Sequence, residues 1–163
     1  MKIYIFRHAL ADFSRPAPDS KHPENPPLTR EGRAQVKQVT SLAREFGFKP
    51  NLIVSSPLVR AKETAEITKE TIGLKSPVVV DECLFGEKNP EQVYQFLRKR
   101  RKSDQIVLVS HQPLIDKLTS GLLGGKASIR FINGAIACIE IDSKPARGKG
   151  HLSWLLPPGR PNH

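Results

Sequence analysis

Three short apolar runs, each followed at once by polar residues, constrain the fold of this chain more than any other feature. The runs are rich in β-branched and aromatic residues, which is the composition of buried strands. Ligands of open α/β sheets bind beyond the carboxyl ends of the strands, so the residues that follow the runs are expected to form a site. The runs cover residues 3–6, 52–54 and 106–109, and they lead into Arg7-His8, Ser55-Ser56 and Ser110-His111.

Helix signals alternate with these runs. Capping residues and prolines stand where each helical pattern begins, and apolar residues then recur at helical spacing. Such alternation predicts an α/β fold with a mostly parallel central sheet flanked by helices, in one domain over residues 1–163. The expected helix starts are Thr29, Pro57, Asn89 and Pro113, and the remaining predicted strands cover residues 78–80, 129–132, 135–141 and 151–156.

The charge of the chain points to an anionic partner. Lys and Arg outnumber Asp and Glu by 26 to 16, which gives a net charge of +10. Nucleic acid, an acidic membrane surface and a phosphorylated substrate all fit such a charge. Nucleic acid is the least favoured, because aromatic residues make up only 6% of the chain and no RNA- or DNA-reading motif is recognised. The basic run at residues 98–102 is more typical of cations at the negative end of a helix.

Two further features bear on the compartment. No apolar stretch approaches the roughly 18 residues of a membrane span, so no membrane segment is expected. The two cysteines, Cys83 and Cys138, stand among apolar neighbours without the spacing of metal ligands. They are interpreted as reduced core thiols, which favours a cytoplasmic protein.

One more basic residue, Arg60, follows the second run by about one helical turn. If the three strands are parallel neighbours, Arg7, His8, Arg60 and His111 meet at one edge of the sheet, beside helix N-termini that attract anions. A guanidinium binds phosphate through two parallel N–H donors, and an uncharged imidazole is a nucleophile. Zinc would need a third ligand, which is not evident near the two histidines. The sequence therefore predicts phosphate chemistry that needs no metal and no cofactor.

The motifs resemble those of the histidine phosphatase superfamily, also called the phosphoglycerate mutase-like family. The matching segments are Arg7-His8-Ala9, Leu28-Thr29 through Gly32, residues 56–64 and residues 109–113, in an order and spacing that cover most of the chain. The small size and the phrase Ser110-His111-Gln112-Pro113-Leu114 are most similar to bacterial SixA-type phosphohistidine phosphatases. One departure is Ala9, where the wider superfamily usually has glycine.

The resemblance implies a covalent mechanism. His8 would attack phosphorus and become a phosphohistidine, which water then hydrolyses, while Arg7, Arg60 and His111 would bind the phosphoryl oxygens as substrate-binding residues. His111 is expected to be cationic when phosphate is bound. By the same resemblance the acid that protonates the leaving group is Glu82, although a purely structural role for Glu82 stays open. Asp12 and Glu24 are weaker candidates for that acid.

The expected substrate is phosphohistidine on a protein, such as a histidine-containing phosphotransfer domain. Larger relatives carry extra helices between the positions of Thr64 and Ser110 that roof the pocket, and the short span here predicts a minimal fold without a lid insert. The Pro-rich stretch over residues 9–27 is either a mobile rim or a plain surface loop. A phosphatase or mutase of the same superfamily that acts on small phosphate esters is the first alternative, and a nucleic-acid-binding module is the second.

Overall fold

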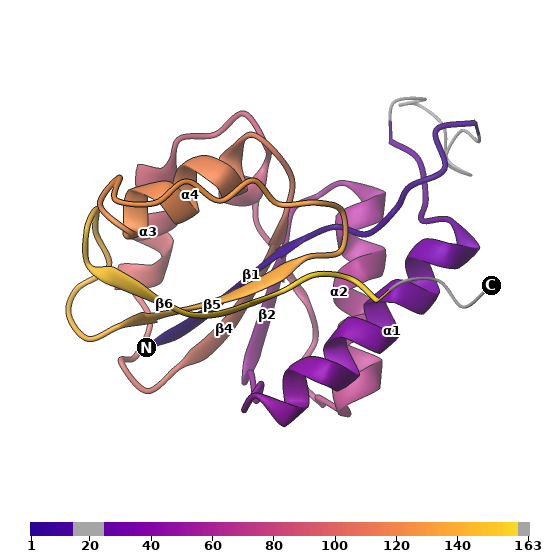
Figure 1. The fold of residues 1–163 in the computed structure, drawn as a ribbon, viewed down its shortest axis with the longest axis horizontal. Helices are drawn as coiled ribbons and strands as arrows, with labels where there is room; N and C mark the ends of the chain where they lie inside the picture. Colours follow the sequence, from indigo (N-terminus) through magenta and orange to yellow (C-terminus); the bar gives the residue numbers. More distant parts are fainter. Residues whose placement is uncertain (15–24, 160–163) are drawn as a thin grey trace.

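The computed structural model describes residues 1–14 and 25–159, and six strands of these residues form one sheet (Figure 1). The strand order is β3-β2-β4-β1-β5-β6. The first four strands along this order are parallel, whereas β5 and β6 are antiparallel to their neighbours. The strands are β1 (Lys2–Arg7), β2 (Leu52–Ser55), β3 (Val79–Val80), β4 (Gln105–Ser110), β5 (Ile136–Ile141) and β6 (Gly150–Leu156).

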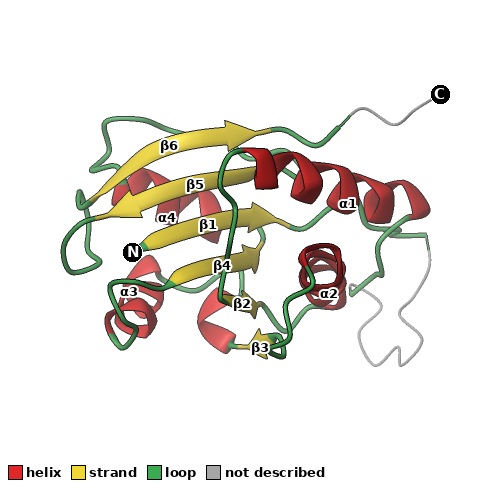
Figure 2. Ribbon diagram, turned by 90° about the horizontal axis from the view of Figure 1, so that it is seen from below, coloured by secondary structure: helices red, strands yellow, loops and turns green. Residues whose placement is uncertain are grey.

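Helices cover both faces of this sheet (Figure 2). Side chains alternate along β1, so that Ile3 and Ile5 face one hydrophobic cluster while Tyr4 and Phe6 face the other. The cluster of Ile3 and Ile5 contains the buried residues of α3 and α4, and the second cluster contains those of α1 and α2. The predicted fold class, a mostly parallel sheet flanked by helices, is therefore confirmed. The helices are α1 (Arg30–Glu45), α2 (Val59–Ile72), α3 (Pro90–Arg98) and α4 (Leu114–Leu122), with a 3-10 turn η1 (Glu82–Leu84).

The register of the parallel strands brings their carboxyl ends together. Arg7 pairs with Ser110 across β1 and β4, and Ser55 pairs with Val109 across β2 and β4. The pairing continues past the strands, because the amide of His8 donates to the Ser110 carbonyl at 3.0 Å. Three segments that are distant in sequence therefore end side by side.

The start of α1 fixes the chain just after β1. The Thr29 side chain caps α1 by accepting from the Gly32 amide at 2.8 Å, as predicted, and the Thr29 amide donates to the Leu10 carbonyl at 2.9 Å. A Cβ atom on Gly32 would collide with the backbone of Leu10. The glycine therefore allows the helix to approach the segment that follows His8.

Two local predictions are wrong. Helix α2 begins at Val59 and not at Pro57, because Leu58 keeps an extended conformation at φ −70° and ψ 141°. Residues 129–132 form a loop instead of a strand. Their backbone does not join the sheet because both polar groups of Phe131 are used by side chains: its amide donates to Asp116 Oδ1 at 3.3 Å and its carbonyl accepts from Arg7.

The segment between α2 and β4, residues 73–104, is described throughout. It holds β3, η1 and α3 and shows no insert that would form a lid. The expectation of a minimal fold without a lid insert is confirmed. The stretch over residues 9–27 lies partly outside the described residues, so its expected role as a rim stays a prediction.

Candidate active site

The four residues predicted to converge are brought together at the carboxyl ends of β1 and β4. Arg7 is the last residue of β1 and His8 follows it, His111 follows β4, and Arg60 lies in the first turn of α2. The rings of His8 and His111 have their centroids 6.3 Å apart. The convergence expected from three separate motifs is present in the structure, whereas the roles of these residues are a matter for experiment.

His8 is held as a neutral imidazole with a defined tautomer. Its side chain is 5% exposed, and Nδ1–H donates to the carbonyl of Ala9 at 2.8 Å. Its Nε2 accepts a hydrogen bond from Arg60 Nε at 3.3 Å. The pKa of His8 is lowered to about 3, chiefly by burial and also by the nearby Arg60 and Arg7, against the opposing effect of the Ala9 carbonyl. The lone pair of Nε2 therefore points to the site at neutral pH.

The two arginines are partly buried on either side of His8. Arg7 Nη1 donates to the Phe131 carbonyl at 2.6 Å, and its buried Nε binds no atom of the described residues. The Arg60 guanidinium lies over the ring of Phe13, 5.7 Å from the ring centroid. Burial lowers the pKa of both guanidinium groups, and each still carries a positive charge at neutral pH. Donors of this kind can bind the oxygens of a phosphoryl group.

His111 is also held as a neutral imidazole. Its Nε2 accepts from the Gly86 amide at 3.0 Å and lies 3.3 Å from the Ser56 hydroxyl, which assigns its proton to Nδ1. Burial lowers the pKa of His111 to about 4, with the charges of Arg60 and Arg7 as further causes. A cationic His111, as expected with phosphate bound, would have to give up the bond from Gly86.

Sequence reasoning missed three of these supporting groups. The amide of Gly86 and the carbonyl of Phe131 are backbone atoms, so their residue types carry no signal for the contacts they make. Asn133 donates to the His8 carbonyl at 3.3 Å from the same loop as Phe131. Because residues 129–132 were predicted to form a strand, this loop was not expected. The pair Asn133-Gly134, which is typical of a turn, was the one signal for it in the sequence.

A cavity of about 600 Å³ opens beside Arg60 and His111. Glu82 lies in its wall, as the proposed acid requires, and its side chain is exposed to solvent. Asp12 instead lines a separate hollow with Arg30 and Arg33. Glu24 lies outside the described residues. Of the described candidates for the acid, Glu82 is the one that lines the same cavity as Arg60 and His111.

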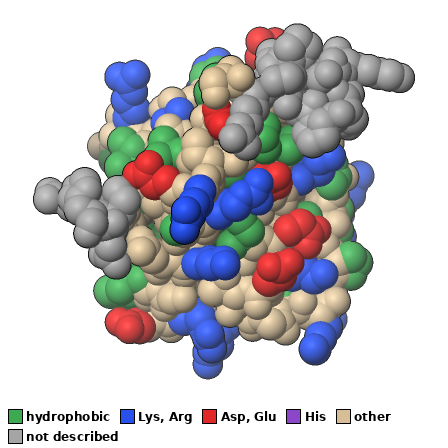
Figure 3. Space-filling model, turned by 90° about the vertical axis from the view of Figure 1, so that its right-hand side faces the viewer, with side chains coloured by type: hydrophobic (Ala, Val, Ile, Leu, Met, Phe, Trp, Pro, Cys, Tyr) green, Lys and Arg blue, Asp and Glu red, His purple; other side chains and the backbone are tan. Residues whose placement is uncertain are grey.

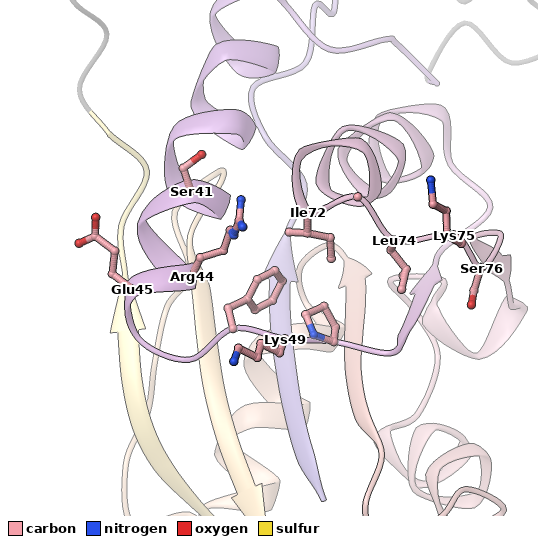
Figure 4. Close-up of a pocket in the computed structure, with 11 residues that line it drawn as sticks. Ser41, Arg44, Glu45, Lys49, Ile72, Leu74, Lys75 and Ser76 are labelled. Carbon is pink, nitrogen blue, oxygen red and sulfur yellow. The ribbon is translucent and has the colours of Figure 1, made fainter.

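A larger hollow of about 800 Å³ lies at the opposite end of the sheet, where α1 and α2 finish (Figure 4). Arg44, Lys49 and Lys75 stand around it. Helix carboxyl ends carry partial negative charge, which these cations offset. None of Arg7, His8, Arg60 and His111 lines this hollow, so it is not assigned to the phosphate chemistry.

The face toward which β1 points is not uniformly basic (Figure 3). On the side toward which β1 points, cationic side chains near the middle of the face are flanked by acidic ones (Figure 3). Within residues 1–14 and 25–159, three His, Cys, Asp or Glu side chains nowhere approach closely enough to hold a metal. The same residues contain no helix with the length and apolar content to cross a membrane.

Comparison with known proteins defines the class. The model of the histidine phosphatase superfamily (branch 1) matches residues 3–85, and the chain belongs to this superfamily of phosphatases. The chain is 24% identical to the phosphohistidine phosphatase SixA of Escherichia coli (strain K12) over 160 residues, which cover 97% of this chain and 94% of SixA.

Solved structures share the fold. That of the protein histidine phosphatase SixA complexed with tungstate superposes with a TM-score of 0.83 at 24% identity and covers 97% of each chain. A mycobacterial glucosyl-3-phosphoglycerate phosphatase superposes with a TM-score of 0.66 at 18% identity, over 93% of this chain and 96% of its own. The phosphoglycerate mutase-like fold expected from the motifs is therefore confirmed.

Proposed function

We propose that this protein hydrolyses phosphohistidine on a protein substrate through a covalent phosphohistidine on its own His8. The observation that carries the proposal is the state of His8: the Nδ1–H bond to Ala9 leaves Nε2 unprotonated, and Arg60 Nε lies 3.3 Å from that nitrogen. A buried, neutral imidazole beside two arginines is a prepared nucleophile for phosphorus.

In the first step His8 Nε2 attacks the phosphorus atom of the substrate. A bond from phosphorus to Nε2 forms, and the bond from phosphorus to the leaving nitrogen or oxygen breaks with its electron pair on the leaving atom. Arg7, Arg60 and His111 bind the phosphoryl oxygens, where charge develops in the transition state. Glu82 in the cavity wall supplies the proton where the leaving group needs one.

In the second step water attacks the phosphorylated His8. A bond from the water oxygen to phosphorus forms, and the bond from phosphorus to Nε2 breaks with its electron pair on the nitrogen. Both protons of the water depart with the inorganic phosphate, and the imidazole returns to the neutral tautomer that the Ala9 carbonyl fixes. The guanidinium groups supply the positive charge that phosphoryl transfer requires, so the proposed reaction uses neither a metal nor a cofactor.

A protein substrate suits the open site. Residues 73–104 add no roof above the cavity, and a phosphorylated side chain on a folded domain can therefore reach His8. A histidine-containing phosphotransfer domain is the proposed kind of partner, which the similarity to SixA supports. We propose a cytoplasmic enzyme of one domain over residues 1–163, in keeping with the free thiols of Cys83 and Cys138.

The test is a turnover comparison with the purified protein. A phosphohistidine peptide, phosphoserine and phosphoglycerate are offered at equal concentration, and kcat/KM is measured for each. The proposal expects the highest value for the peptide. A preference for phosphoglycerate would favour the alternative of a small-ester phosphatase or mutase, with His8 still the nucleophile. Salt-dependent DNA retention that survives the loss of Arg7 and Arg60, without turnover, would favour a nucleic-acid-binding module.

A further inference from the structure

The cavity beside Arg60 and His111 has an unexpected charge. Among the residues that the structure describes, the Lys, Arg, Asp and Glu side chains that line it are Arg60, Glu82 and Glu87, although cations far outnumber carboxylates in the chain as a whole. Arg60 is the one cation among them, and it lies against His8 Nε2, where the phosphoryl group binds. Beyond the phosphoryl group, the described part of the cavity wall therefore presents two carboxylates to a bound molecule.

The two carboxylates belong to a segment that is firmly anchored. Asp81 caps η1 by accepting from the Cys83 amide at 2.8 Å, and the carbonyl of Leu84 accepts from the Ser110 hydroxyl at 2.6 Å. The Leu84 side chain is fully buried. Gly86, between the two glutamates, donates to His111 Nε2. The backbone that carries Glu82 and Glu87 is thus tied to the same residues that form the phosphoryl site.

Much of the remaining described wall is apolar, and Asn25 and Gln112 add polar side chains to it. Pro57, Leu58, Phe85 and Pro113 line it, and the ring of Phe85 stands edge-on to His111 with centroids 5.7 Å apart. Flat apolar groups with carboxylates at the edge form a suitable surface for a planar cation.

We infer that this wall selects a cationic leaving group and that Glu87 is a specificity-determining residue. The inference rests on the proposed function of the phosphoryl site at His8. It adds that the group attached to the phosphoryl moiety is favoured when it carries positive charge and disfavoured when it carries negative charge.

Phosphohistidine has this property. The ring nitrogen that is not bonded to phosphorus binds a proton, and the ring is then a planar cation. When His8 Nε2 forms its bond to phosphorus, the bond from phosphorus to nitrogen breaks with its electron pair on the ring, and a neutral imidazole departs. A carboxylate of Glu82 or Glu87 can accept a hydrogen bond from the protonated nitrogen and so favour the reactive form. Phosphoglycerate carries a carboxylate instead, which the same side chains repel.

The experiment reverses the charge of Glu87 and compares substrates that differ in charge. Phosphocholine, ethyl phosphate and phosphoglycerate give a cationic, a neutral and an anionic group on the same phosphate ester, and a phosphohistidine peptide is measured beside them. In Glu87→Lys the kcat/KM for phosphocholine falls by about threefold relative to ethyl phosphate, and that for phosphoglycerate rises by about threefold. The ratio between the two thus changes by about tenfold, and high salt reduces the change.

Glu70→Lys is the matched control, because Glu70 is exposed near the far end of α2 and its reversal changes the net charge by the same amount. This variant keeps the wild-type ratio. An unchanged ratio in Glu87→Lys, with phosphohistidine still hydrolysed, would overturn the inference and leave the proposed function standing. A shifted ratio in a protein that does not hydrolyse phosphohistidine would overturn the proposed function and leave the charge selection standing.

Discussion

Arg60 Nε lies 3.3 Å from His8 Nε2 and donates a hydrogen bond to it. The contact joins the start of α2 to the end of β1, and it requires that Nε2 carry a lone pair. Because Nδ1–H donates a hydrogen bond to the Ala9 carbonyl, both nitrogens of His8 have a hydrogen-bond partner. The arrangement holds the proposed attacking atom and the proposed cation for the phosphoryl oxygens in one fixed geometry.

The first prediction concerns this contact. Arg60→Lys keeps the positive charge but removes the guanidinium Nε–H that meets His8, and it should still impair catalysis. Arg60→Ala should lower kcat/KM by roughly a hundredfold or more, since a preorganised donor to developing charge is worth about 3–4 kcal/mol. Steady-state kinetics on a phosphohistidine peptide measure both changes, with Arg33→Lys as a surface control. A loss below about threefold in Arg60→Ala would place Arg60 outside the reaction.

The second prediction concerns the stability of the fold toward acid. The pKa of His8 is about 3 and that of His111 about 4 in the folded protein, against 6.5 for an ordinary histidine. As the pH falls below 6.5, these histidines bind protons in the unfolded chain, whereas in the folded protein they stay neutral down to about pH 4. Each histidine therefore lowers the free energy of unfolding by up to about 1.4 kcal/mol per pH unit in this window.

A comparison of the free energy of unfolding of wild type and His111→Gln separates the contribution of His111 from that of the carboxylates, because both proteins contain the same carboxylates. Urea denaturation at several pH values between 4.5 and 7 should show a smaller loss of stability toward acid in the variant. Parallel curves for the two proteins would mean that His111 is not buried as a neutral group.

The third prediction concerns Gly86. A Cβ atom at this position would lie 2.7 Å from Nδ1 and Cε1 of His111. Gly86→Ala should therefore displace the His111 ring and lower kcat by about tenfold to a hundredfold, because small errors in position are costly to catalysis. Thermal unfolding checks that the fold survives, and Lys88→Ala serves as a control in the same segment. Full activity in Gly86→Ala would show that the position of His111 does not matter.

The fourth prediction separates the two substrate classes through Glu82. If Glu82 protonates the leaving group, Glu82→Gln should reduce hydrolysis of an alkyl phosphate by about 10²–10⁴-fold, because an alkoxide leaves poorly. The loss on a phosphohistidine peptide should be much smaller, since the imidazole accepts its proton before the bond breaks. Glu66→Gln on α2 is the control. Equal losses on both substrates would assign Glu82 a structural role.

Much of this fold could be predicted from the sequence because the strands are short, apolar and bounded by clear helix signals. The four site residues could be placed together because parallel strands end at one edge, so that Arg7-His8 and His111 had to meet. The loop of Phe131 could not be predicted in this way, since its apolar composition is that of a strand. Hydrogen bonds from Arg7 to the Phe131 carbonyl and from the Phe131 amide to Asp116 keep its backbone out of the sheet. The tautomer of His111 was equally hidden, because the amide of Gly86 sets it.

The central claim is that His8 carries the phosphoryl group during turnover. Phosphohistidine is labile in acid and survives in alkali, so an alkaline quench of the enzyme during hydrolysis of a radiolabelled phosphohistidine peptide should trap label on His8, whereas an acid quench should retain little. Peptide mapping of the trapped enzyme locates the label, and His8→Ala should trap none and show no turnover while keeping its fold. Label on another residue, or wild-type turnover by His8→Ala, would contradict the mechanism.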